Sequence, residues 1–204
     1  MNFEWEDSRR AFHDAGDWYV ATTALVGDRW DQPGLGEWNV RDLVGHASRS
    51  FLTVETYLDQ PAEIVAFETA GAYVKAARVI AAGPGVAQRG RYAGAALGDD
   101  PVSAVAEIGA RVRRLVDTCD GTERLTTIVG GMRLRDYLPT RTFELAVHTA
   151  DLALALGEPL DVPTSAAAQA LAIVSEIALS DGTAGSLLLQ VTGRTGLPQA
   201  FSVL

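Results

Sequence analysis

Apolar residues recur at helical spacing in four long stretches of the chain. They predict long helices over about 7–27, 40–58, 101–119 and 134–156. Residues typical of helix ends lie at the edges of these stretches. Asn39 and Asp100 are favourable N-caps, Pro101 suits a first helical position, and Gly157 suits the position after a C-terminus. Four long helices with apolar faces predict a mainly α protein built as a four-helix bundle.

The stretches between these helices give weaker signals. A further helix is expected over 69–82, followed by a Gly- and Ala-rich stretch, irregular or partly helical, up to residue 100. The segment 125–129 reads as a short extended piece before a turn at 130–131.

The C-terminal part is expected to form a helix and a β-hairpin. The helix runs from about 164 to 179, and the hairpin has strands at 187–192 and 200–204 around a turn at 193–196. We therefore expect a bundle domain over 1–158 and a short C-terminal part over 159–204.

Composition and charge narrow the possible functions. The chain has 204 residues, of which 48% are hydrophobic and 21% charged, as in a soluble globular protein with one sizeable core. A net charge of −9 argues against nucleic acid and anionic membranes as partners. The single cysteine, Cys119, excludes an intramolecular disulfide and favours a cytoplasmic location. The acidic start is unlike a signal peptide, and no apolar run reaches the ~18 residues of a membrane span.

A stripe of ionisable residues runs along the expected helix 134–156. Because each helical residue advances by about 100°, Arg141, Glu144, His148 and Asp151 share one face. The stripe is either a solvated face or the lining of a cavity, where buried charges need partners or a metal ion. A carboxylate and an imidazole four residues apart supply two metal ligands, whereas a zinc site needs three or four.

His46 is the candidate third ligand. It falls in the second turn of the helix 40–58, at the border of the apolar face. The alternative is a hydrogen-bonded interior histidine. If the two helices are neighbours, His46 meets Glu144 and His148, which gives two imidazoles and one carboxylate. Three protein ligands with an open position are typical of a catalytic rather than a structural zinc site.

Three segments also resemble a known family: Trp38-Asn-Val-Arg-Asp-Leu-Val-Gly-His46, Arg141-Thr-Phe-Glu-Leu-Ala-Val-His-Thr-Ala-Asp151 and the tail around Leu188–Arg194. Together they look like the mycothiol-dependent maleylpyruvate isomerase family, part of a wider DinB-like group of metal-dependent helical bundles. The resemblance covers essentially the whole chain and implies a DinB-like four-helix bundle. The C-terminal part is shorter than the α/β domain that members of this family often carry.

The resemblance implies a divalent metal, typically zinc, on His46, Glu144 and His148, with mycothiol as the thiol co-substrate at the open position. In the family reaction, the thiolate adds to the cis double bond of maleylpyruvate, the bond rotates, and elimination gives the trans isomer. Arg194 matches a C-terminal catalytic arginine that holds a substrate carboxylate. Its alternative is an ordinary turn residue in Gly-Arg-Thr-Gly.

Two residues of the stripe are candidates for orienting the metal ligands from behind. Asp151 is placed to orient His148, and Arg141 to orient Glu144, although both could equally be surface charges. The leading hypothesis is a metal- and mycothiol-dependent isomerase or S-transferase acting on an unsaturated or electrophilic small molecule. The alternative is a non-catalytic helical bundle that binds a small molecule or a protein partner.

Overall fold

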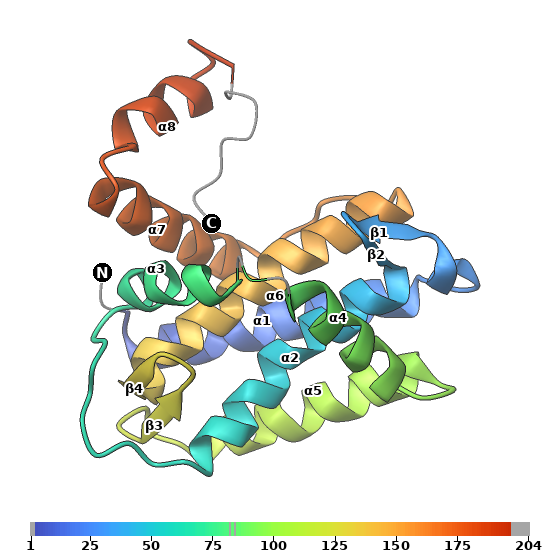
Figure 1. The fold of residues 1–204 in the computed structure, drawn as a ribbon, viewed down its shortest axis with the longest axis horizontal. Coiled ribbons are helices and arrows are strands. Elements are labelled where there is room, and N and C mark those ends of the chain that lie inside the picture. Colours follow the sequence, from blue (N-terminus) through green and yellow to red (C-terminus); the bar gives the residue numbers. More distant parts are fainter. Residues whose placement is uncertain (1–2, 82, 84, 197–204) are drawn as a thin grey trace.

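The main body of the protein is a bundle of four long helices (Figure 1). The computed structural model describes residues 3–81, 83 and 85–196. The bundle helices are α1 (Trp5–Ala24), α2 (Val40–Leu58), α5 (Pro101–Asp117) and α6 (Leu134–Leu156). Helices α1 and α2 each pack against both α5 and α6. The mainly α architecture predicted from the sequence is confirmed. No described helix is long and apolar enough to cross a membrane.

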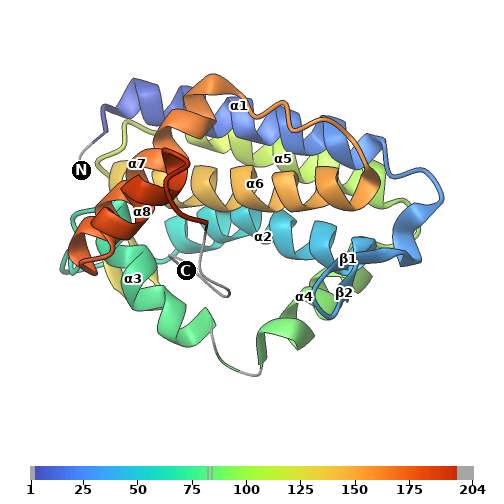
Figure 2. The same ribbon diagram turned by 90° about the horizontal axis from the view of Figure 1, so that it is seen from above.

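Shorter helices surround this bundle. They are α3 (Ala70–Ala81), α4 (Gly85–Ala96), α7 (Thr164–Ser180) and α8 (Ala184–Val191), with a 3-10 turn, η1, at Arg29–Asp31. Helix α4 packs on α2, α3 packs on α6 and α7, and α7 packs on α6 and α1. Figure 2 shows α3 and α4 on the same side of α2, near its opposite ends. The Gly- and Ala-rich stretch before residue 100 is therefore largely helical.

Two small antiparallel hairpins complete the described fold. Strands β1 (Pro33–Leu35) and β2 (Trp38–Asn39) lead into α2, and β3 (Arg124–Thr127) and β4 (Gly130–Arg133) lead into α6. The turn expected at 130–131 is wrong, because these residues begin β4 and the turn lies at 128–129. A glycine is needed at position 131 because another segment of the chain passes close to the strand. A Cβ atom there would overlap the backbone oxygen of Ile64, which runs alongside the strand.

The expected strand at 187–192 is also wrong, because this segment forms α8 and the turn after it. Short apolar runs do not separate strand from helix by periodicity, and the residue types here, Leu and Gln, are good helix formers. The expected return strand, 200–204, lies outside the described residues. Helix α8 packs against α7.

The predicted helix ends are confirmed by their hydrogen bonds and backbone angles. Asn39 accepts a hydrogen bond from the backbone nitrogen of Asp42 at 2.9 Å, and Asp100 caps α5 in the same way. Gly157 ends α6 in the left-handed conformation, with a φ of 71°. These local signals fix where α2 and α6 start and stop, and hence which residues face each other across the bundle.

Helices α2 and α4 cross at two glycines. A Cβ atom at Gly45 would overlap the backbone of Ala93 and Gly94, and one at Gly94 would lie 2.8 Å from the oxygen of Arg41. The backbones therefore touch where side chains would normally separate them. Because Gly45 immediately precedes His46, this contact also fixes α4 beside the candidate metal ligand.

We expect Gly45→Ala to destabilise the protein by about 1–3 kcal/mol, because the added methyl group must push α4 away from α2. Gly185→Ala is the control. It is also helical, but a Cβ atom there would have no neighbour within 4 Å, so we expect stability unchanged or raised by up to about 1 kcal/mol. Urea unfolding measures both. Equal free energies of unfolding for the two variants would contradict the close helix crossing.

Candidate metal centre

The three predicted ligands come together between α2 and α6. His46 comes from α2, and Glu144 and His148 come from α6. Their possible ligand atoms all lie within 4.8 Å of one another. The imidazole rings of His46 and His148 meet edge to face, with centroids 4.8 Å apart. The side chains of Glu144 and His148 are 29% and 15% exposed, so this part of the stripe lines a cavity rather than an open surface.

Trp38 and α4 hold the ring of His46 in place. The Trp38 indole stacks on the imidazole with centroids 4.4 Å apart, and its Nε1 donates a hydrogen bond to the backbone oxygen of Ala87 at 3.0 Å. Gly90 gives the indole room, because a Cβ atom there would lie 2.5 Å from the ring. The hairpin β1–β2 therefore supplies, just before α2 begins, the side chain that orients a ligand on α2.

His46 carries a buried ring nitrogen without a partner. Its Nδ1 is out of contact with solvent and forms no hydrogen bond within the part of the chain that the structure describes. Burial and the positive charge of His148 lower the pKa of His46 to about 4, so the ring is neutral at pH 7. A buried ring nitrogen without a hydrogen-bond partner lowers the stability of the folded protein unless a ligand binds to it.

His148 lies between two carboxylates. Its Nδ1 is 3.1 Å from Oδ2 of Asp151, and its Nε2 is 3.3 Å from Oε2 of Glu144. Burial lowers the pKa of His148, but the hydrogen bonds to Asp151 and Glu144 outweigh it and raise the pKa to about 9. Burial raises the pKa of Glu144, but His148 and the charge of Arg141 hold it at about 2. Without a metal ion, the two groups form an ion pair.

The donor set fits a divalent metal ion. Two imidazoles and a carboxylate are good zinc ligands, and three of them leave one position open. The 3.3 Å between His148 and Glu144 suits zinc, since two tetrahedral ligands about 2.0–2.1 Å from the ion lie about 3.3 Å apart. Asp151 would then accept a hydrogen bond from the other ring nitrogen of His148, an arrangement that fixes the orientation of a metal-bound imidazole.

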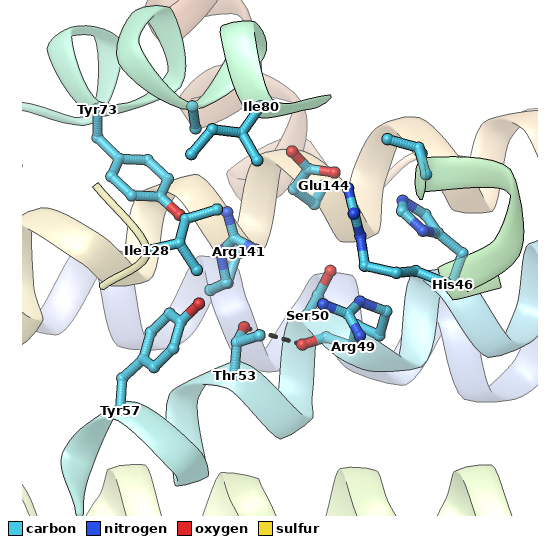
Figure 3. Close-up of a pocket in the computed structure, with 13 residues that line it drawn as sticks. His46, Arg49, Ser50, Thr53, Tyr57, Tyr73, Ile80, Ile128, Arg141 and Glu144 are labelled. Carbon is cyan, nitrogen blue, oxygen red and sulfur yellow. Dashed lines mark hydrogen bonds between the residues drawn. The ribbon is translucent and has the colours of Figure 1, made fainter. Parts of the chain in front are cut away.

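The triad opens into a cavity between α2, α3, α4 and α6. One lobe, of about 290 Å³ and called the polar lobe below, is lined by Arg49, Ser50, Tyr57 and Arg141, with Ile80 and Ile128 as apolar neighbours (Figure 3). Arg89 also lines this lobe. The other lobe, of about 350 Å³, has a more apolar wall to which Trp38 and Val74 contribute, whereas Ala77 and Val86 line both lobes. His46 and Glu144 line both lobes, so an ion bound to them would face the whole cavity.

The guanidinium group of Arg141 packs on aromatic rings and does not pair with Glu144 in the described structure. Its guanidinium group lies over the rings of Tyr137 and Tyr73, 4.9 and 5.7 Å from their centroids, and its Nε donates a hydrogen bond to Oγ1 of Thr140 at 2.9 Å. Its charge lowers the pKa of Glu144, but within the described chain the two side chains form no ion pair. Arg141 is therefore a cavity residue with an electrostatic effect on the carboxylate.

Arg194 lies elsewhere in the described structure, in the turn after α8. Its exposed guanidinium group donates a long hydrogen bond, 3.5 Å, to the backbone oxygen of Thr192. Its catalytic role stays a prediction. Sequence reasoning missed Arg49 and Arg89 as cavity residues. Arg49 was detectable, because it follows His46 by one helical turn, whereas Arg89 lies on a helix that the sequence did not clearly predict.

Comparison with known proteins identifies a family. Residues 10–153 match the model of the family described as the mycothiol maleylpyruvate isomerase N-terminal domain. This segment contains α2 and nearly all of α6, and so includes His46, Glu144 and His148. No curated protein and no solved structure matches the chain.

We expect zinc to bind more weakly at lower pH. Metal ions bind neutral imidazole, and the raised pKa of His148, about 9, keeps this ring protonated in the metal-free protein at pH 7. The apparent affinity should therefore rise about tenfold per pH unit between pH 6 and 8 and level off above about 9. Competition with a chromophoric chelator measures this. An affinity independent of pH over that range would contradict the arrangement.

Asp151→Asn should weaken zinc binding by about 10–100-fold, because the amide supports the imidazole of His148 less well than the carboxylate does. Asp161→Asn is the matched control, since it removes the same charge from an exposed residue in the segment before α7. The same competition assay compares the two. Equal affinities in both variants would show that Asp151 does not support the site.

Proposed function

The chain belongs to the mycothiol maleylpyruvate isomerase N-terminal domain family, and we propose that it is a metal-dependent enzyme that uses a small thiol as co-substrate. The observation that carries the proposal is the convergence of His46, Glu144 and His148, whose possible ligand atoms lie within 4.8 Å of one another. Two imidazoles and a carboxylate around an accessible cavity form one of the ligand sets that catalytic zinc sites use.

His46, Glu144 and His148 would hold the ion, with zinc as the favoured metal. A zinc ion in such a site lowers the pKa of a bound thiol, so that the thiolate forms near neutral pH. We propose mycothiol as this thiol, on the strength of the family match. Other residues orient the two histidine ligands: Asp151 orients His148, and Trp38 fixes the ring of His46.

The cavity supports addition of a thiol to an unsaturated or electrophilic small molecule. Its two lobes meet at His46 and Glu144, so the thiol and the acceptor can approach the same point from different sides. Trp38 and Val74 give the second lobe an apolar wall, which would leave a thiolate bound there less hydrated than in open solvent. If the adduct eliminates the thiol after bond rotation, the reaction is an isomerisation like that of maleylpyruvate. If the adduct is released, the reaction is an S-transfer.

The test compares His148→Ala with His13→Ala. His13 lies on α1, where its Nε2 is 3.4 Å from Asp117, and so serves as a histidine outside the site. We expect about one zinc ion per chain in the wild type and in His13→Ala, and almost none in His148→Ala. Turnover of an electrophile panel that includes maleylpyruvate should require mycothiol and should be lost with the zinc.

Stoichiometric zinc in His148→Ala would overturn the proposed metal site. Zinc binding that depends on His148, but without any mycothiol-dependent turnover across the panel, would overturn the enzymatic proposal and favour a binding protein with the same site.

A further inference from the structure

The polar lobe of the cavity contains a group of arginines without acidic partners. Among the described residues that line it are Arg49 from α2, Arg89 from α4 and Arg141 from α6. None of the three forms an ion pair within the described chain, whereas other arginines such as Arg111 and Arg113 do. Among the described residues that line this lobe, Glu144 is the one carboxylate, and it is paired with His148.

These three arginines form no ion pair within the described chain although acidic residues are in excess. The chain has 26 acidic residues against 17 basic ones, so most positive side chains can find a carboxylate on the surface. Three guanidinium groups gathered in one cavity repel one another, and their charges are partly withdrawn from water. Such an arrangement costs free energy unless an anion occupies the cavity.

The surroundings of these arginines suit an anionic group. Arg141 is held from behind by the rings of Tyr73 and Tyr137 and by Thr140, so its guanidinium group is fixed before a ligand arrives. Ser50 and Tyr57 add hydroxyl groups to the same lobe (Figure 3). Guanidinium groups bind carboxylates through paired hydrogen bonds, which adds orientation to the attraction of the charges.

We infer that Arg49, Arg89 and Arg141 form an anion subsite that holds a carboxylate group of the substrate beside the metal centre. The inference rests on the proposed function, and it assigns the polar lobe to the acceptor and the more apolar lobe, with Trp38 and Val74, to the thiol. The subsite selects an electrophile that carries a carboxylate within a few bonds of its reacting carbon. Arg141 thereby acts as a specificity residue rather than as a support for Glu144.

The experiment measures anion binding to the full chain after metal removal, so that the ligand cannot bind to the ion itself. The probes are succinate and its neutral diamide, succinamide, followed by isothermal titration calorimetry. We expect succinate to bind the wild type and succinamide not to bind. Arg49→Gln and Arg89→Gln should each weaken succinate binding about tenfold, the effect of losing one charge-assisted hydrogen bond.

Arg114→Gln is the matched control. It removes the same charge from an exposed residue on α5, outside the lining of the cavity, and should leave the affinity for succinate unchanged. Circular dichroism shows whether each variant is folded. If one cavity variant does not fold, the other carries the test, because Arg49 and Arg89 lie on different helices.

Two results would overturn the subsite: succinamide binding as tightly as succinate, or both cavity variants binding succinate as tightly as Arg114→Gln does. The zinc content and mycothiol-dependent turnover of the wild type report separately on the proposed function. Succinate binding that depends on the arginines, in a protein without zinc or turnover, would keep the subsite and reject the proposed function.

Discussion

The enclosed pair of Glu144 and His148 is the interaction on which the rest of the site depends. Charged groups withdrawn from water cost free energy unless they are paired or bind a ligand. Here each imidazole nitrogen of His148 meets a carboxylate, and His46 completes the group from the facing helix. The glycine crossing of α2 and α4, with Trp38 packed against His46, closes the structure around these residues. The fold therefore brings together three possible metal ligands from two helices, a set that neither helix supplies alone.

The sequence predicted the bundle well because its signals are local. Helical spacing and caps such as Asn39 and Gly157 depend on neighbouring residues, and all four bundle helices were expected close to their observed bounds. The errors fall where local signals are ambiguous or where distant contacts decide. The apolar run in α8 is compatible with either helix or strand. Gly131 was interpreted as a turn residue, but it is needed because a distant segment approaches β4.

The candidate site shows the same difference between local sequence signals and contacts with distant segments. Glu144 and His148 could be paired from their spacing on one helix, and His46 from the expectation that two helices are neighbours. Arg89 could not be found, because its place in the cavity depends on how α4 packs across α2. Arg141 was a candidate either to orient Glu144 or to be an ordinary surface charge. The aromatic rings that hold its guanidinium group come partly from α3, which the stripe on α6 does not reveal. Spacing along one helix predicts a shared face, whereas the function of that face depends on the elements opposite.

The central claim is that His46, Glu144 and His148 bind one metal ion. The most direct measurement is a crystal structure of the zinc-loaded protein with anomalous diffraction data collected at the zinc absorption edge. The account predicts a single strong anomalous peak in the cavity, about 2.0–2.1 Å from a ring nitrogen of each histidine and bound by the carboxylate of Glu144. A peak bound by other residues, or no peak here at saturating zinc, would contradict it.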